Sequence, residues 1–100
     1  MAPSIVKFIP VDPTTRPISQ EDIENWRIQP KELVGKYFLS TELLRRVFLV
    51  DDYSVSQRKG AQYDVLYEDT GLDETLTIKP ETLLEMVAEA ELVTNALPRH

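Results

Sequence analysis

Two stretches in the second half of the chain alternate between apolar and polar residues, and together they predict a β-hairpin. The stretches are QYDVLYE (residues 62–68) and ETLTI (residues 74–78). Side chains alternate between the two faces of a strand, so Tyr63, Val65 and Tyr67 share one face of the first strand. The intervening DTGLD holds the glycine and aspartates that favour a turn. We therefore expect an antiparallel pair of strands whose turn and flanks are acidic.

A helical period follows the hairpin and predicts a helix over residues 80–93. Pro80 fits the first turn of a helix, and Glu81 interacts favourably with the helix dipole. The apolar stripe of this helix consists of Leu83, Leu84, Val87, Ala88 and Ala90. A helix with one apolar stripe packs that stripe against a core, so we expect it to cover the sheet. Beyond Thr94, the tail of residues 95–100 is expected to fray.

The N-terminal part of the chain predicts an extended arm and then a short helix. Residues 1–17 contain four prolines, which remove backbone donors and block a helix, although SIVKFI within them can form an edge strand. Ser19, followed three residues later by Asp22, resembles a capping box. The two residues predict the start of a helix that Pro30 ends. The globular domain is expected over residues 18–94.

The centre of the chain is rich in β-branched and aromatic residues, which favour strands. We expect strands near residues 36–39 and 46–54. Between them, the segment STELLRR can instead form a helical turn, because leucine and arginine favour helices and Ser40 or Thr41 can cap one. The following SVSQRKGA, residues 54–61, is expected to be a loop.

Composition places the chain among folded proteins with a single domain. It has 100 residues, of which 42% are hydrophobic and 28% are charged, and it contains no cysteine. A chain of this length buries about two-thirds of its unfolded surface, enough for one core. The lack of cysteine excludes disulfides and thiolate chemistry and fits a reducing compartment. Apolar runs are short, so we expect a soluble, intracellular protein, cytoplasmic or nuclear, without a membrane span or signal peptide.

Negative charge is concentrated in the second half of the chain. The formal net charge is −6, and nine acidic residues against one basic residue between Asp64 and Glu91 leave −8 there and +2 elsewhere. Such a surface repels phosphate backbones, so direct binding of nucleic acid is not expected. The basic residues available for a small local patch are Arg45, Arg46, Arg58 and Lys59. The acidic region serves solubility, or it attracts a basic partner protein.

Three segments between Leu33 and Ile78 resemble the Tudor-like group of small SH3-like barrels. They are LVGK at 33–36, YDVLYED at 63–69 and DETLTI at 73–78. In that group a VGK element opens the first strand, a V-x-Y-x-D element closes the third, and an acidic turn leads into a short strand and a helical turn. The patterns and the resemblance together lead us to expect an α+β fold. It is a small, strongly bent antiparallel sheet or SH3-like partial barrel with a short N-terminal helix and a C-terminal covering helix.

The resemblance implies a module that binds short segments of other proteins. Such domains often hold a methylated lysine or arginine in an aromatic cage, because aromatic faces attract these cations and nearby carboxylates add charge complementarity. The candidate aromatics are Phe48, Tyr53, Tyr63 and Tyr67, of which Tyr53 and Tyr67 are preferred. The candidate acids are Asp51, Asp52, Glu68, Asp69, Asp73 and Glu74. Aromatics in strands are also common core residues, so packing is the alternative role for each.

No arrangement of residues indicates catalysis, and we expect a non-enzyme without a metal or cofactor. The single histidine, His100, lies in the fraying tail, where it is not a plausible base for a nucleophile. Adjacent carboxylates such as Asp51 and Asp52 point to opposite faces of a strand, and DTGLDE lacks the ligand spacing of an EF-hand loop. The three glycines are isolated, so they form no phosphate-binding loop.

Two functions of different classes remain. One is a Tudor-like reader that holds a basic peptide on an acidic, aromatic-bearing sheet face. The other is an adaptor, assembly or inhibitor subunit, for instance viral or bacterial, that engages a partner protein through its acidic hairpin and helix and its N-terminal arm. An exposed Trp26 favours the second, since exposed tryptophans often mark interfaces. Convergence of Tyr53 and Tyr67 on an open pocket favours the first.

Overall fold

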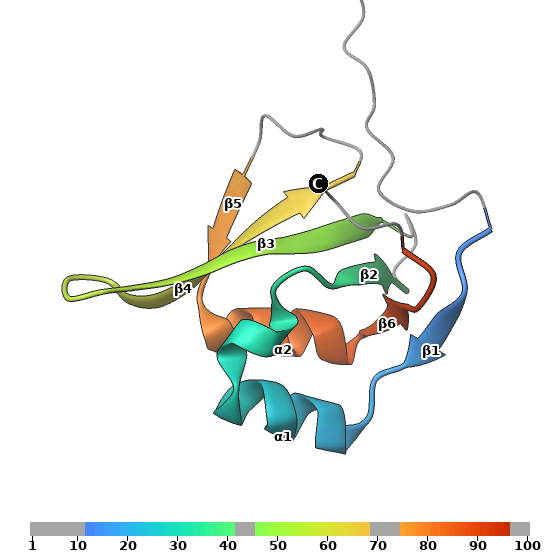
Figure 1. Ribbon diagram of the computed structural model, residues 1–100, viewed down its shortest axis with the longest axis horizontal. Helices are drawn as coiled ribbons and strands as arrows, with labels where there is room; N and C mark the ends of the chain where they lie inside the picture. The colour runs from blue at the N-terminus through green and yellow to red at the C-terminus, as the bar shows by residue number, and fades with distance from the viewer. Residues whose placement is uncertain (1–11, 42–45, 69–74, 97–100) are drawn as a thin grey trace, which may run out of the picture.

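The computed structural model describes residues 12–41, 46–68 and 75–96, and this part of the chain has an α+β fold. Its sheet is antiparallel and has six strands in the order β1-β6-β2-β3-β4-β5, with both α helices on one side (Figure 1). The elements in chain order are β1 (Thr15–Pro17), α1 (Gln20–Ile28), the 3₁₀ helix η1 (Pro30–Leu33), β2 (Tyr37–Ser40), β3 (Val47–Ser56), β4 (Gly60–Tyr67), β5 (Thr75–Ile78), α2 (Pro80–Ala88) and β6 (Ala90–Val93). None of the described helices has the length and apolar character needed to cross a membrane.

The predicted capping box at the start of α1 is confirmed. The Asp22 N–H donates to the Ser19 hydroxyl at 3.1 Å, and the Ser19 N–H donates to the Asp22 carboxylate at 2.9 Å. Arg16, in β1, also donates to this carboxylate at 2.8 Å. The Arg16 guanidinium and the Ser19 N–H together hold the pKa of Asp22 well below its ordinary value. Asp22 therefore caps α1 and also fixes β1 against the helix.

The predicted hairpin is present as β4 and β5. Tyr63 lies opposite Ile78 and Val65 lies opposite Leu76, so the apolar residues of the two strands share a face, as the alternation indicated. β5 begins at Thr75. The acidic turn expected at residues 69–73 lies outside the described residues.

The loop expected at residues 54–61 is wrong, because β3 and β4 continue through it as a two-stranded ribbon. β3 runs to Ser56 and β4 starts at Gly60, and the two residues face each other across a short turn. Gly60 has a φ of 74°, in the left-handed region that glycine adopts without strain, and such a residue commonly completes a tight hairpin turn. Polar residues here reflect exposure on both faces of the ribbon rather than absence of a strand.

The helix expected over residues 80–93 ends early, at Ala88. After Glu89 the chain forms β6, which pairs with β2 on one side and β1 on the other. The apolar residues from Ala90 to Val93 fit a helical stripe or a strand equally well. Pairing with strands on both sides satisfies the backbone N–H and C=O groups of β6, and this favours the strand over a longer helix.

Both ends of the described chain join the sheet, so the domain extends further than residues 18–94. Within the expected N-terminal arm, Thr15 of β1 lies opposite Val93 of β6. Beyond the strands, the Thr94 N–H donates to the Thr14 carbonyl at 2.7 Å, and the Asn95 side chain accepts from the Thr14 N–H at 2.7 Å. The tail expected to fray from residue 95 is therefore held by the N-terminal segment at its first residue. SIVKFI and His100 lie outside the described residues.

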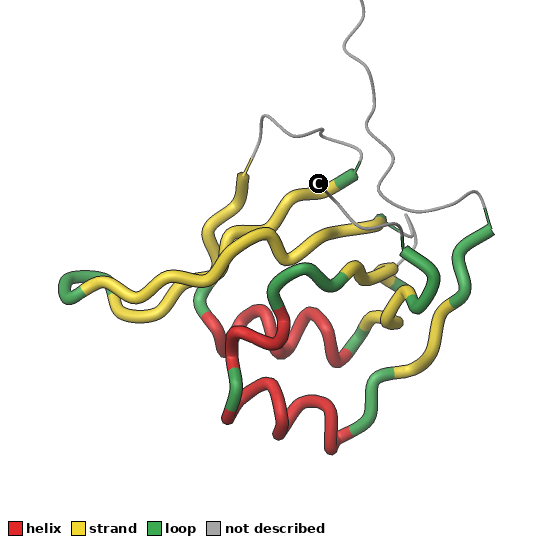
Figure 2. The backbone as a smooth tube through the Cα atoms, viewed as in Figure 1, coloured by secondary structure: helices red, strands yellow, loops and turns green. Residues whose placement is uncertain are grey.

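Two clusters of buried apolar residues lie on opposite faces of the sheet. The larger cluster packs the sheet against the helices, and Figure 2 shows both helices on this side. Its fully buried members include Leu33, Phe38, Val50, Tyr63, Val65, Leu83 and Val87. The smaller cluster contains Tyr37, Leu39, Val47, Leu49, Leu66 and Val93. β2, β3 and β4 are thus buried on both faces over part of their length.

Candidate protein-binding surface

Two of the aromatic residues proposed from the sequence belong to the core. Phe48 is 2% exposed and stacks on Phe38, with the ring centroids 5.4 Å apart. Trp26 is 4% exposed and packs edge to face with Phe38, with the ring centroids 5.8 Å apart. Aromatic pairs with this geometry stabilise a core beyond the area that they bury. The assignment of Phe48 to ligand contact is therefore wrong, and Trp26 gives no support for an interface.

Tyr53 packs against Tyr63 at the point where the ribbon leaves the body of the protein. Their ring centroids lie 4.9 Å apart, on strands whose register places the two residues opposite each other. The Tyr63 hydroxyl donates to the Pro30 carbonyl at 2.6 Å, which ties β4 to the start of η1. Burial, with a smaller contribution from Tyr53, raises the pKa of Tyr63 to about 12.

Tyr63→Phe is expected to lower the free energy of unfolding by about 1 kcal/mol at neutral pH, because the Pro30 carbonyl loses its donor. The raised pKa means that the folded state retains the neutral phenol. The neutral Tyr63 phenol contributes to the free energy of unfolding. This contribution is complete below the pKa of tyrosine in the unfolded chain, about 10, and is lost as the pH rises through the folded-state pKa of about 12. Urea denaturation at pH 8 and at higher pH should show the parent and the variant converging. Parallel pH profiles of the two proteins would contradict this role for Tyr63.

Tyr67 holds a cation from its own chain. The Arg46 guanidinium carbon lies 3.8 Å from the centre of the Tyr67 ring. Tyr67 lies opposite Phe48, whereas Tyr53 lies opposite Tyr63. Tyr67 lies four positions after Tyr63 in β4, a distance of about 13 Å along an extended strand. Tyr53 and Tyr67 therefore do not converge on one pocket. The aromatic cage predicted from the sequence requires such convergence.

Among the described acids proposed from the sequence, Asp52 lies on the sheet face opposite the candidate aromatics. β3 contains a register shift between Val50 and Asp52, so Asp52 lies opposite Asp64, and Tyr53 joins the face that carries Val50. Asp51 and Asp52 are exposed, and Asp64 accepts a hydrogen bond from the Thr77 hydroxyl at 3.2 Å. Glu68 is partly exposed just beyond β4. Asp69, Asp73 and Glu74 lie outside the described residues.

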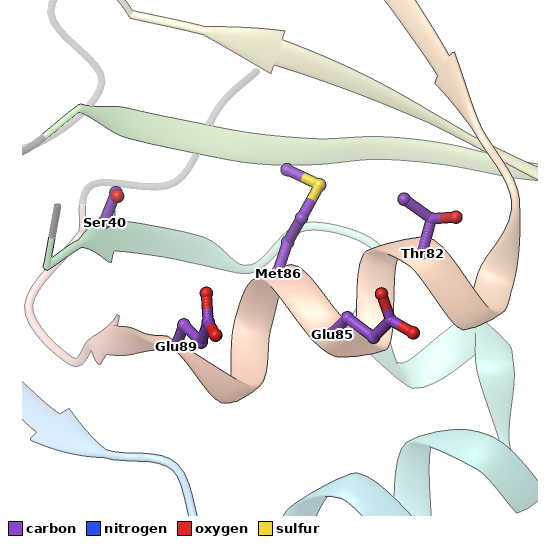
Figure 3. Close-up of a pocket in the computed structure, with 5 residues that line it drawn as sticks. All are labelled: Ser40, Thr82, Glu85, Met86 and Glu89. Atoms are coloured by element: carbon purple, nitrogen blue, oxygen red, sulfur yellow. The ribbon is translucent and has the colours of Figure 1, made fainter.

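A surface cavity of about 210 Å³ lies beside α2 and gathers acidic and hydroxyl groups. Its lining residues are Ser40, Thr82, Glu85, Met86 and Glu89. Figure 3 shows the last four rising from one side of α2 and its C-terminal end, with Ser40 at the end of β2 beside them. The Thr41 hydroxyl donates to the Glu89 carbonyl at 2.6 Å and holds the end of α2 against β2. We refer to this feature as the acidic cavity.

Sequence reasoning identified these glutamates as part of the acidic region but not as a site. The available signal is the spacing of Thr82, Glu85, Met86 and Glu89, since residues three and four apart share a face of a helix. The contribution of Ser40 depends on the pairing of β2 with β6, which the sequence does not show. The polar side of α2 therefore forms a hollow rather than a flat solvated face.

The described residues contain no group of three or more histidine, aspartate or glutamate side chains positioned to hold a metal ion. No protein-family model matches the chain, and comparison with curated proteins and with solved structures returns no match. The acidic cavity and the charge around it are therefore the features of the described residues that bear on function.

Proposed function

We propose that this protein is a non-catalytic interaction module that binds a basic segment of another protein at the acidic cavity. The observation that carries the proposal is the lining of the cavity. Glu85 and Glu89 contribute carboxylates, Ser40 and Thr82 contribute hydroxyl oxygens, and Met86 contributes an apolar surface. Among the described residues that line the cavity, none is basic. A lysine or arginine side chain matches this set, because its stem packs on apolar atoms while its charged end meets the carboxylates.

The end of α2 adds to the attraction for a cation. A helix carries a partial negative charge at its C-terminus, and the last turn of α2 contains no basic residue of its own. Glu89 directly follows this turn, so the carboxylate and the helix end act in the same direction. Exposed ion pairs contribute about 0.2–1 kcal/mol each. Binding therefore requires several basic residues in the partner, and the surrounding negative charge mainly accelerates association.

The order of the elements supports an SH3-like partial barrel as the scaffold of this module. VGK directly precedes β2, YDVLYE covers the end of β4, and the short strand β5 and the helix α2 follow. β6 then returns to pair with β2, the first strand of the β2-β3-β4-β5 series. These are the features on which the Tudor-like resemblance rests. A methyl-lysine reader of that kind needs Arg46 to leave the Tyr67 ring, so we favour charge recognition over an aromatic cage.

Titration with a fluorescent lysine-rich peptide and its trimethyllysine counterpart tests the proposal. The parent is expected to bind both peptides similarly and to lose affinity as salt rises, because exposed charges are screened over about 8 Å at physiological ionic strength. Glu85→Lys/Glu89→Lys should weaken binding about tenfold or more, since two attractive charges become repulsive. A preference for the methylated peptide that Tyr67→Ala removes would instead establish the cage.

The matched control is Glu21→Lys/Glu32→Lys, which makes the same change in net charge at two exposed positions outside the cavity. This control is expected to retain most of the affinity of the parent. Circular dichroism of both double variants checks that the fold is intact. Equal loss of affinity in the two variants would assign binding to overall charge, and retained affinity in Glu85→Lys/Glu89→Lys would exclude the acidic cavity.

A further inference from the structure

The two glutamates of the acidic cavity differ from other glutamates nearby in having no cationic neighbour. Within the described part of the chain, neither Glu85 nor Glu89 forms an ion pair. By contrast, Arg27 of α1 pairs with Glu24 of the same helix, and its Nε atom lies 3.9 Å from a carboxylate oxygen of Glu81 in α2. No described basic side chain therefore competes with a partner for the carboxylates of the cavity.

The acceptor oxygens of the cavity are spread over a distance rather than gathered at one point. Glu85 and Glu89 are four residues apart in chain order, which corresponds to about 6 Å along a helix axis, and they share one face of the helix. Figure 3 shows their carboxylates on the same side of α2, with the Met86 side chain between them in this view. The hydroxyls of Thr82 and Ser40 add acceptors at other points of the lining.

We infer that the acidic cavity is an arginine site, which binds the guanidinium group of an arginine in preference to the ammonium group of a lysine. This inference rests on the proposed binding of a basic segment, and it names the side chain that the cavity selects from that segment.

The spread of the acceptors favours a guanidinium over an ammonium. Arginine carries five N–H donors on a planar fork, and they leave its different edges in different directions, whereas the three donors of lysine leave one nitrogen. One edge of the fork can donate to Glu85 and another to Glu89, and the remaining donors are left for the hydroxyls. Charge-assisted hydrogen bonds of this kind are stronger and more directional than neutral ones.

Met86 adds a second reason for the preference. Its side chain is partly buried and packs against the larger core cluster, so it presents an apolar surface within the cavity. A guanidinium is more weakly hydrated than an ammonium, and its flat faces therefore approach an apolar surface at a smaller cost in lost water. Recognition of arginine thus uses the carboxylates at its edges and the thioether at its face.

Two fluorescent peptides of the same length, with either arginine or lysine at the same alternating positions, test the inference. Their net charges are equal, so the ratio of their dissociation constants isolates the choice of side chain. The arginine peptide is expected to bind the parent about threefold more tightly or better. Equal affinities would overturn the inference and leave the proposed function intact. Absence of binding by either peptide up to about 1 mM would overturn the proposed function and the inference with it.

Glu85→Gln and Glu89→Gln locate the preference within the cavity. Each substitution keeps the size of the side chain and removes one carboxylate. Each should weaken the arginine peptide more than the lysine peptide and bring the ratio of affinities close to one, since only the guanidinium uses both carboxylates at separate edges. The matched control is Glu21→Gln, at an exposed position of α1 outside the cavity, which should retain the ratio of the parent.

Arginine adheres more strongly than lysine to many acidic surfaces, and the glutamine variants distinguish that general effect from a site. A preference that persists in both cavity variants, with circular dichroism showing an intact fold, would assign it to other acidic surfaces and overturn the inference. A citrulline peptide keeps the planar shape of arginine without its charge, and it should bind about tenfold more weakly or worse. Citrulline and arginine peptides of equal affinity would exclude recognition of a cation at the cavity.

Discussion

Replacing Leu83 or Val87 with aspartate is expected to unfold the protein. Both side chains are 0% exposed and pack from α2 into the larger core cluster. Burial of a carboxylate without a partner costs several kcal/mol, whereas a domain of this size has a total stability of about 5–15 kcal/mol. We expect each variant to lose the cooperative thermal transition that the parent shows by circular dichroism at pH 7.

Ala88→Asp is the matched control for these substitutions. Ala88 lies in the same helix, directly after Val87, and its side chain is exposed, so its expected place in the apolar stripe that packs on the core is wrong. The control introduces the same charge into α2 but leaves it in water, so it should lower the free energy of unfolding by less than about 1 kcal/mol. Similar melting of Leu83→Asp and Ala88→Asp would show that α2 does not pack on the sheet through this face.

Elements whose signals are local in sequence were predictable. The capping box needs only Ser19 and Asp22, three residues apart, and the structure contains both of its hydrogen bonds. The pairing of β4 with β5 follows from two alternating stretches joined by a short segment, and the residues Tyr63 and Ile78 do face each other. In these cases the interactions that fix the structure lie close together along the chain, so the residue pattern records them.

Elements that depend on distant pairing were not predictable in the same way. Nothing in residues 90–93 distinguishes the last turn of a helix from β6, which is fixed by β1 and β2 from other parts of the chain. The register shift after Val50 is a second example. Regular alternation places Tyr53 on the face opposite Val50, whereas the shift puts both against the larger core cluster. One additional residue thus separates Asp52 from the aromatics with which we expected it to act.

The candidate site likewise combines a feature that the local sequence predicts with one that depends on distant pairing. The carboxylates of Glu85 and Glu89 were evident as part of an acidic region, and the helical spacing places them on one face. The hollow between them and Ser40 depends on β6 bringing the end of α2 against β2. The charge of the site was therefore readable from the sequence, while its shape was not.

Phe48→Ala is expected to lower the free energy of unfolding by about 3–5 kcal/mol, the range typical for removal of a buried phenylalanine ring. The Phe48 ring centroid lies 5.4 Å from that of Phe38, on which it stacks, and 5.7 Å from that of Tyr67. Removal of the ring therefore opens a cavity between the sheet and the helices. Urea denaturation at pH 7 measures this loss. The substitution takes a large part of the total stability of such a domain, and we expect a folded but easily denatured variant.

Phe48→Leu separates packing from aromatic recognition. Leucine retains much of the buried apolar volume but removes the ring contacts, which contribute about 0.5–1.5 kcal/mol per aromatic pair. This variant should therefore recover most of the stability lost in Phe48→Ala. Because Phe48 is 2% exposed, it should also bind a lysine-rich peptide with the affinity of the parent. A leucine variant that is stable but no longer binds would return Phe48 to the binding site and would contradict its assignment to the core.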